Sequence, residues 1–344
     1  MNASVTRLHL LIPGLLGPMR NFDSSGVTLS APRLEKILSR ADQRSCCGED
    51  YLTTLFALFD HPLSRERDLP EGAVNYYATG ADVADACWIR ADPVHLRPDR
   101  DRLLLFNCEQ MEITASEAEE IARQFNAHFA EEGFQLLTAG PERWYLKLKH
   151  CPELKTHGLS QVVGHHIEPF MPEGHDARRW RQLLNEMQML LFQSPVNQQR
   201  EAEGRLTING LWLSGIGQLP EVKQSRFDKV CGDDPTAVGM ARLAKVQTEP
   251  VAVHELPCKE GEENLMVLTD LVSPVLNADP YRWSDAITVL DRRIGLLADG
   301  LQRIKKSQLV LYPCNGDSYR VTAGLLRRFW LRTKKLPALL PKSN

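Results

Sequence analysis

The hydrophobic and polar positions along the chain alternate between two kinds of pattern. Short apolar runs predict buried strands, and these runs lie at residues 8–12, 103–106, 206–213, 265–270 and 309–312. Apolar residues at helical spacing predict helices, and these lie at residues 31–40, 51–59, 114–132, 177–191, 235–244, 283–302 and 322–332. Because strands and helices alternate, the pattern predicts an α/β fold with a mainly parallel sheet.

The middle of the chain departs from this alternation. Thr114-Ala115-Ser116-Glu117 has the form of a capping box and opens the helix predicted at 114–132. Two strands at 134–137 and 143–148, joined through Gly140 and Pro141, then predict a hairpin-like element. The stretch from about 107 to 175 therefore reads as a small α+β insertion.

Composition limits the classes of partner. The chain has 344 residues, of which 43% are hydrophobic and 25% charged, with a formal net charge of -3, so we expect a globular protein of about two domains. No block of lysine and arginine dominates the chain, and we expect no nucleic-acid partner. No apolar run approaches the ~20 residues of a membrane helix, and we expect no membrane partner.

The cysteines and the first apolar run bear on the compartment. Pro13 and Gly14 interrupt that run, which reads as a buried strand and not as a signal peptide. The eight cysteines are scattered and include no Cys-x-x-Cys pair. We therefore expect reduced thiols and a cytoplasmic location.

Charged residues are most dense between Trp88 and Arg102, where four arginines, three aspartates and one histidine precede an apolar run. Pro93 and Pro98 exclude a helix, so the segment is predicted to be a loop or an extended arm. Its arginines would either grip a phosphate or carboxylate or form an internal web of ion pairs. The nearly equal numbers of positive and negative groups favour the web.

Three further motifs have two interpretations each. The strand before Gly215-Ile216-Gly217 either delivers a ligand loop or is a buried strand with a tight turn, and spacing alone leaves both open. Gly164-His165-His166-Ile167-Glu168 contains metal-ligand residue types, but its flanking prolines favour a polar loop. Cys314 follows a buried strand, where α/β active sites often lie, although a packed thiol is the simpler interpretation.

Several stretches together resemble the bacterial RpfE-type regulatory proteins. These stretches are Arg90–Arg97, Asn185–Leu190, Pro195–Asn197 and Asn209–Trp212. A more distant resemblance is to the archaeal-type cofactor-independent phosphoglycerate mutases of the alkaline phosphatase superfamily. The mutases carry an Asn-x-x-Trp-x-Trp-Gly-x-Gly stretch, which Asn209, Trp212 and Gly215-Ile216-Gly217 match, with Ser214 at the second tryptophan.

That resemblance implies a two-metal mechanism with a serine nucleophile, and the expected residues are missing from the sequence. The first strand ends in Pro13-Gly14 without the metal-binding aspartate, and Gly48-Glu49-Asp50 has glutamate in place of the serine. The region after the strand at 265–270 contains no histidine through residue 279. The last strand continues into Tyr312-Pro313-Cys314-Asn315 in place of an Asp-His pair.

The matched and missing motifs together lead to the following expectations. We expect an alkaline-phosphatase-like core at 1–87 and 206–344, with an insertion domain at 88–205. We expect a catalytically inactive, regulatory relative of the mutases, with no catalytic residue, no metal and no cofactor. A phosphorylated or carboxylated small molecule or a regulatory protein is the expected partner. The candidate ligand-binding residues are Arg90, His95, Arg97, Asn209, Trp212, Gly215 and Gly217.

Two alternatives remain open. A phosphomutase or phosphatase with a rearranged site would draw metal ligands from Glu49, Asp50, His61, His95 and Asp270. A pure interaction protein would instead use an exposed apolar patch on the insertion domain.

Overall fold

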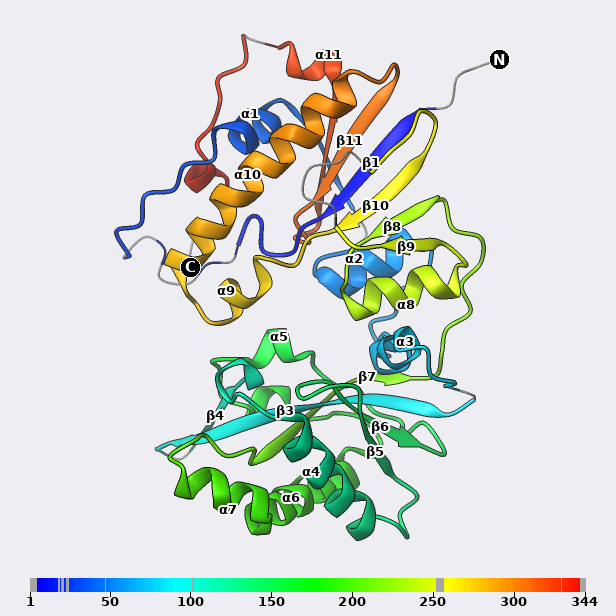
Figure 1. Cartoon of the computed structure of the whole chain (residues 1–344), viewed down its shortest axis with the longest axis vertical. Helices are drawn as coiled ribbons and strands as arrows, with labels where there is room; N and C mark the ends of the chain where they lie inside the picture. The colour runs from blue at the N-terminus through cyan, green and yellow to red at the C-terminus, as the bar shows by residue number, and fades with distance from the viewer. Residues whose placement is uncertain are drawn as a thin grey trace. The chain divides into compact units, whose positions relative to one another are not determined.

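The chain folds into two compact units, which are described separately. The computed structural model describes residues 5–17, 19, 22, 25–46, 48–83, 85–100, 102–251, 257–328 and 330–340. Unit 1 combines Met1–Leu63 with Val222–Asn344, and unit 2 is the continuous segment Ser64–Glu221. Figure 1 shows the elements of both units along the chain.

Unit 1 contains a seven-stranded sheet in the order β2-β12-β11-β1-β10-β8-β9. The strands are β1 (Thr6–Leu11), β2 (Asp42–Ser45), β8 (Lys229–Cys231), β9 (Gln247–Glu249), β10 (Glu263–Val267), β11 (Ser307–Tyr312) and β12 (Asp317–Thr322). The five strands from β11 to β9 are parallel, whereas β12 and β2 are antiparallel additions at one edge. The predicted α/β class with a mainly parallel sheet is therefore confirmed.

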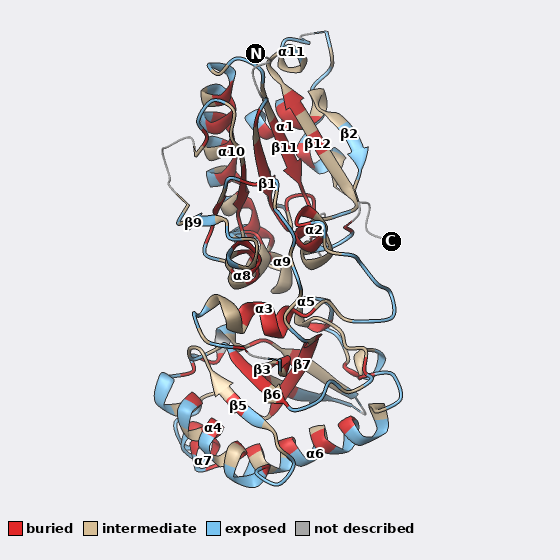
Figure 2. Ribbon diagram, turned by 90° about the vertical axis from the view of Figure 1, so that its right-hand side faces the viewer, coloured by how far each residue is buried: buried red, intermediate tan, exposed pale blue. Residues whose placement is uncertain are grey.

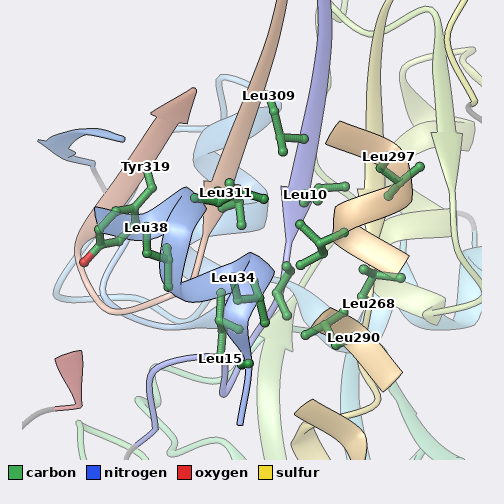
Figure 3. Packing of buried hydrophobic residues seen from close by; sticks show 14 of the residues in the cluster. Leu10, Leu15, Leu34, Leu38, Leu268, Leu290, Leu297, Leu309, Leu311 and Tyr319 are labelled. Carbon is green, nitrogen blue, oxygen red and sulfur yellow. The ribbon is translucent and has the colours of Figure 1, made fainter. Parts of the chain in front are cut away.

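The larger core of unit 1 lies between this sheet and two helices, α1 (Pro32–Arg40) and α10 (Pro280–Gln302). Leu10 of β1, Leu34 of α1 and Leu290 of α10 belong to one buried cluster, which Figure 3 shows from close by. The other helices of the unit are α2 (Tyr51–Leu58), α8 (Pro235–Leu243), α9 (Val272–Leu276), α11 (Ala323–Leu326) and η3 (Leu336–Leu339). Figure 2 shows that buried positions line the strands and part of α10.

The helix predicted at 322–332 is wrong. Its first residue ends β12, and only the single turn of α11 follows. Tyr319 and Val321 of β12 join the core, so strand pairing with β11 provides the burial that the prediction had assigned to a helix.

Unit 2 is built on an antiparallel sheet. Its strands are β3 (Cys87–Asp99), β4 (Arg102–Phe106), β5 (Gln135–Thr138), β6 (Trp144–Leu148) and β7 (Gly210–Gly217). Its helices are α3 (Glu71–Ala78), η1 (Cys108–Gln110), α4 (Ala115–His128), α5 (Leu159–Val162), η2 (Glu168–Phe170), α6 (Ala177–Gln193) and α7 (Pro195–Ala202). The predicted boundaries at 88 and 205 lie inside this unit, because α3 and β7 pack against β3.

The charged segment that was predicted to be a loop or an arm is mostly the long strand β3. Its prolines exclude a helix, as predicted, but they do not exclude a strand, and Pro93 lies opposite Leu211 of β7. Ile89 and Ala91 point into the core of unit 2, whereas Arg90 and Asp92 alternate to the other face. A strand accommodates these charges because Arg90 pairs with both Asp92 and Glu71.

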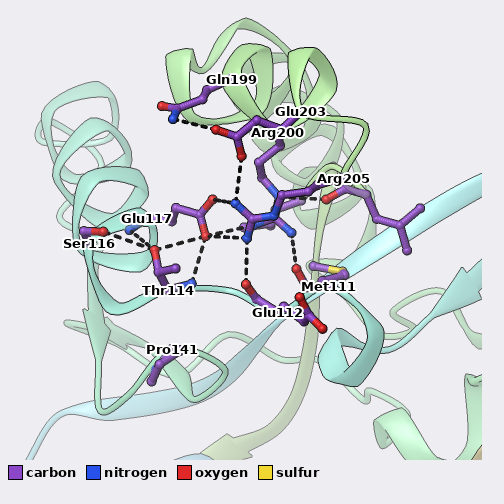
Figure 4. A network of polar contacts seen from close by, with 12 residues as sticks. Met111, Glu112, Thr114, Ser116, Glu117, Pro141, Gln199, Arg200, Glu203 and Arg205 are labelled. Carbon is purple, nitrogen blue, oxygen red and sulfur yellow. Dashed lines mark hydrogen bonds and ion pairs between the residues drawn. The ribbon is translucent and has the colours of Figure 1, made fainter.

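A buried arginine joins three parts of unit 2. Arg200 of α7 is fully buried, and its Nη1 lies 2.8 Å from Glu117 of α4. Its Nε donates to the Leu206 carbonyl at 2.7 Å, and its Nη2 donates to the Met111 carbonyl. Glu117 also completes the predicted capping box with Thr114, so one carboxylate caps α4 and neutralises Arg200 (Figure 4).

One disulfide corrects the expectation that every thiol is reduced. Cys87 and Cys151 are bonded, with their Cα atoms 5.2 Å apart. The sequence offered no spacing signal for this pair, because the two residues are 64 positions apart and meet only when β3 pairs with β6. Among the described helices, none combines the length and apolar character needed to cross a bilayer.

Candidate functional site

The two motifs singled out in the sequence lie on neighbouring strands. β3 and β7 pair antiparallel, which places Arg90 opposite Ser214 and Asp92 opposite Trp212. The stretch 215–217, predicted to be a loop, is the end of β7 itself. The predicted ligand residues on both strands therefore belong to one sheet, and α3 packs against the same two strands.

Arg90 is held between two carboxylates. Its Nη1 lies 2.5 Å from Glu71 Oε1 and its Nη2 lies 2.6 Å from Asp92 Oδ1. The side chains of Glu71 and Asp92 are 7% and 3% exposed, whereas that of Arg90 is 27% exposed. Burial alone would lower the pKa of Arg90, but the charges of Asp92 and Glu71 outweigh burial and raise it well above its ordinary value. The three groups together carry one more negative than positive charge.

Two buried oxygens beside this ion pair accept no hydrogen bond from the described residues. They are Asp92 Oδ2 and Asn75 Oδ1, while the Asn75 amide donates to Glu71 at 3.4 Å. Burial raises the pKa of Asp92 more than the Arg90 guanidinium lowers it. The cluster can therefore accept further hydrogen bonds, from water or from a ligand that carries donors.

His95 and Arg97 are not brought together with Arg90. Strand alternation places them on the opposite face of β3. His95 Nδ1 lies 2.9 Å from the Thr207 carbonyl, and the Arg97 guanidinium lies 4.6 Å from the centre of the Phe106 ring. The three-residue grip suggested by the sequence is thus divided between two faces.

Residues in and just before β7 form hydrogen bonds with β3 and with the segments beside the sheet. Asn209 bonds to the backbone N–H and carbonyl of Leu96 at 2.6 and 2.8 Å, which locks the start of the β3–β7 pairing. Trp212 Nε1 donates to the His157 carbonyl at 2.8 Å. Asp68 accepts from the backbone N–H groups of Thr156 at 3.0 Å and Ile216 at 3.3 Å.

The glycines of β7 allow α3 to approach. Gly215 has φ 64°, and a Cβ there would lie 2.7 Å from Glu71 Cβ. A Cβ on Gly217 would lie 2.6 Å from Pro70 Cβ. The two glycines therefore serve close packing that brings Glu71 to Arg90.

Glu71, Asn75 and Asp68 were missed by the sequence reasoning. Glu71 and Asn75 lie on α3, whose short apolar stretch produced no helix prediction. The signal that was present is Pro70 followed by Glu71, since proline and an acidic residue are both favoured at a helix start.

The carboxylates near the strand ends of unit 1 have structural partners. Asp50 caps α2 by accepting from the Thr53 N–H at 2.7 Å, and Asp234 caps α8 by accepting from the Ala237 N–H at 3.0 Å. His61 packs edge-on against Phe56, and Asp270 lies 3.9 Å from Arg293. In the part of the chain that the structure describes, no group of three or more His, Cys, Asp or Glu side chains is placed to hold a metal.

A second polar cluster crosses the sheet of unit 1. His9 of β1 lies 3.0 Å from Glu263 Oε1 through Nε2 and 3.0 Å from the Tyr312 hydroxyl through Nδ1. Burial favours the neutral acid, yet hydrogen bonds from His9 and Arg7 hold the pKa of Glu263 down at about 2. Burial lowers the pKa of His9. A neutral His9 then donates a hydrogen bond to Glu263 and accepts one from Tyr312, so both ring nitrogens of His9 have a partner.

Comparisons with known proteins identify distant relatives. No family model matches the chain. A probable 2,3-bisphosphoglycerate-independent phosphoglycerate mutase from Geobacter sulfurreducens is 26% identical over 146 residues, covering 41% of this chain and 35% of that protein. The 2,3-bisphosphoglycerate-independent phosphoglycerate mutase from Methanosarcina mazei is 29% identical over 84 residues, covering 24% and 21%. The matches thus span about a third or less of these curated relatives.

The comparison with solved structures covers more of the chain. The PH0037 protein from Pyrococcus horikoshii has a TM-score of 0.53 and 15% identity, covering 92% of this chain and 87% of that one. A cofactor-independent phosphoglycerate mutase from Thermoplasma acidophilum has a TM-score of 0.44 and 14% identity, covering 97% and 94%. The likeness to PH0037 supports the predicted fold, an α/β core with a second sheet.

Proposed function

We propose that the chain is a phosphoglycerate-mutase-like protein that does not interconvert phosphoglycerates and acts in regulation by binding a ligand or a protein. The observation that carries this proposal is the pairing of Arg90 with both Glu71 and Asp92. A guanidinium that grips a phosphate offers its N–H fork to the ligand. Here two of its N–H groups are already bound to carboxylates, and the excess negative charge repels an incoming phosphate.

The carboxylates of unit 1 support the same proposal. Asp50 and Asp234 accept backbone N–H groups at helix starts, and Tyr51 donates its hydroxyl to Asp234. A carboxylate engaged in this way would have to lose a cap worth about 1 kcal/mol before it could turn to a metal.

A direct assay tests this proposal. The purified protein is incubated with Mn²⁺ or Zn²⁺ and 3-phosphoglycerate, and the product is followed by ³¹P NMR. We expect no conversion above the rate without protein, while the Methanosarcina mazei mutase, assayed in parallel as a positive control, shows turnover. Interconversion that depends on added metal, together with metal content found by elemental analysis, would refute the proposal.

The ligand is proposed to be a phosphorylated or carboxylated small molecule, with a regulatory protein as the other partner and a cytoplasmic location. Because Glu71 and Asp92 already engage Arg90, we expect calorimetry with 3-phosphoglycerate to show that Arg90→Ala loses stability before it loses binding, and Trp212→Ala is the second variant to test. If Arg90→Ala abolishes binding while the circular dichroism spectrum is unchanged, Arg90 contacts the ligand. If the variant loses stability first, Arg90 has a structural role in the ion-pair web.

The alternative function is a phosphomutase or phosphatase with a rearranged site. The names of the two curated relatives favour it. Turnover in the assay above would establish this alternative, and substitution of Glu49, Asp50, His61 or Asp270 would then show which side chains the reaction needs.

A further inference from the structure

The disulfide of unit 2 combines a buried sulfur with an exposed residue. Cys87 opens β3 and is 1% exposed, whereas Cys151 is exposed in the segment that follows β6. Small thiols can therefore approach from the Cys151 side. Thiol–disulfide exchange depends on such access.

The segment from Cys151 to His157, here called the tethered segment, is attached at both of its ends. The disulfide holds its start to β3. At its other end the Thr156 N–H donates to Asp68 at 3.0 Å, and the His157 carbonyl accepts from Trp212 Nε1 at 2.8 Å. Trp212 lies opposite Asp92 in the β3–β7 pairing, so the tethered segment adjoins the candidate site.

The described cysteines whose pKa is raised are poor nucleophiles for attack on this disulfide. Burial raises the pKa of Cys231 to about 11 and that of Cys108 and Cys258 to about 12. Burial also raises the pKa of the Cys314 thiol. Because the thiolate is the attacking species, these four groups do not readily reshuffle the disulfide.

We propose that Cys87–Cys151 is a reversible thiol–disulfide exchange site, and that its redox state determines how firmly the tethered segment holds Asp68 and Trp212. A small thiolate attacks the Cys151 sulfur, forms a mixed disulfide there and releases the Cys87 thiolate. A second small thiolate then attacks the small molecule's sulfur in this mixed disulfide and releases the Cys151 thiolate. Two small thiols are oxidised to one small disulfide, and the protein gains two electrons and, once both thiolates are protonated, two protons.

This inference rests on the proposed cytoplasmic location, because disulfides in that compartment are usually transient. Opening of the bond removes the covalent attachment of the tethered segment, which keeps the backbone pairing of Lys155 with Glu173 and the hydrogen bond from the Glu153 N–H to Asp176. Fluctuations of the segment then strain the hydrogen bonds of Thr156 and His157, which are the remaining links to the site.

The redox step is tested by counting thiols. Cells that express the full chain are quenched in acid, and the denatured protein is alkylated before and after reduction. We expect the fraction with the Cys87–Cys151 bond, identified as a linked peptide pair by mass spectrometry, to rise after a thiol-oxidant pulse and to fall again on recovery. A bond that stays fully formed, or that never forms, overturns the proposal whatever the result of the mutase assay.

The structural step is read at Trp212. Its indole ¹H–¹⁵N signal, assigned by comparison with Trp212→Phe, should shift when the purified protein is reduced by glutathione. Hydrogen exchange of the backbone in residues 153–157 should become roughly fivefold faster, the effect expected when one hydrogen bond of about 1 kcal/mol is lost.

Matched variants complete this test. Cys151→Ser should show the shifted indole signal and the faster exchange without any reductant. Cys108→Ser, which removes a thiol outside the disulfide, should still respond to glutathione like the natural protein. An unshifted indole signal and unchanged exchange in both the reduced protein and Cys151→Ser would overturn the link between the disulfide and the site.

Discussion

The charge on Arg90 is stabilised by the two carboxylates that it contacts. With the Glu71 and Asp92 side chains 7% and 3% exposed, loss of the guanidinium would leave two buried anions without a cation. Removing one member of such a buried group typically costs more than the intact group contributes, because the remaining charge is desolvated and unpaired.

We therefore expect Arg90→Met to lower the free energy of unfolding by about 3 kcal/mol at neutral pH. The loss should shrink in acid, because burial raises the pKa of Asp92 and its protonation removes one of the unpaired anions. Arg97→Met, at an exposed position on the same strand where the guanidinium lies over the Phe106 ring, is the control and should lower stability by no more than about 1 kcal/mol. Urea unfolding measures both variants, and equal effects would contradict this account of Arg90.

The low pKa of Glu263 lets us predict how the free energy of unfolding depends on pH. Its pKa of about 2 in the folded chain is below the 4.5 of an ordinary glutamate. Its contribution is therefore complete above about pH 4.5 and is lost as the pH falls toward 2. Because the side chain is partly exposed, we expect this loss to amount to about 2 kcal/mol.

Glu263→Gln should flatten this acid limb of the stability curve, whereas Glu260→Gln, at an exposed position, should leave it unchanged. Thermal unfolding between pH 5 and pH 2.5 is a suitable measurement. If both variants retain the same steep acid limb, the His9–Glu263 contact is not its source.

At the scale of elements, the approach of α3 to β7 decides whether Glu71 reaches Arg90. Gly215 combines φ 64° with a virtual Cβ only 2.7 Å from Glu71 Cβ. Gly204 has a similar φ of 70° but nothing within 4 Å of its virtual Cβ. Substitutions at the two glycines therefore distinguish the cost of backbone strain from the cost of a steric clash.

Gly215→Ala should cost about 3 kcal/mol, because left-handed backbone strain adds to the clash with α3. Gly204→Ala should cost only about 1 kcal/mol, since it has the strain without the clash. Chemical unfolding of the two variants provides the comparison. Similar losses would show that α3 does not press on β7 as closely as described.

The same scale shows what the sequence could and could not predict. β1, β10, β11 and α10 carry strong apolar signals and were predicted near their observed bounds, whereas the short parallel strands β8 and β9 were not predicted. β3 was not, because its alternation of core residues with Arg90 and Asp92 resembles a polar loop until the partner carboxylates are known. The Cys87–Cys151 bond and the Glu71 contact join residues far apart in the chain, and local pattern carries no information about such pairs.

At the scale of the whole molecule, unit 2 has the attributes of an independent domain. It is one continuous segment with its own sheet, its own buried cluster, the Arg200 network and the disulfide. We therefore expect a fragment of residues 64–221 to unfold cooperatively on heating and to give a dispersed NMR spectrum. A fragment that binds hydrophobic dyes and melts without a transition would contradict this expectation.

Unit 1, by contrast, is assembled from the two ends of the chain. β1 lies between β10 and β11, and its registers join Arg7 to Glu263 and Thr6 to Ser307. A ribosome adding about 5–20 residues each second therefore needs roughly 13–50 s after making β1 before the first of these partners exists. Both edges of this strand, which is buried in the folded protein, remain unpaired during that time, while unit 2 is synthesised and folds. Synthesis in the cell should thus depend on chaperones that bind nascent chains, and slower translation should increase aggregation.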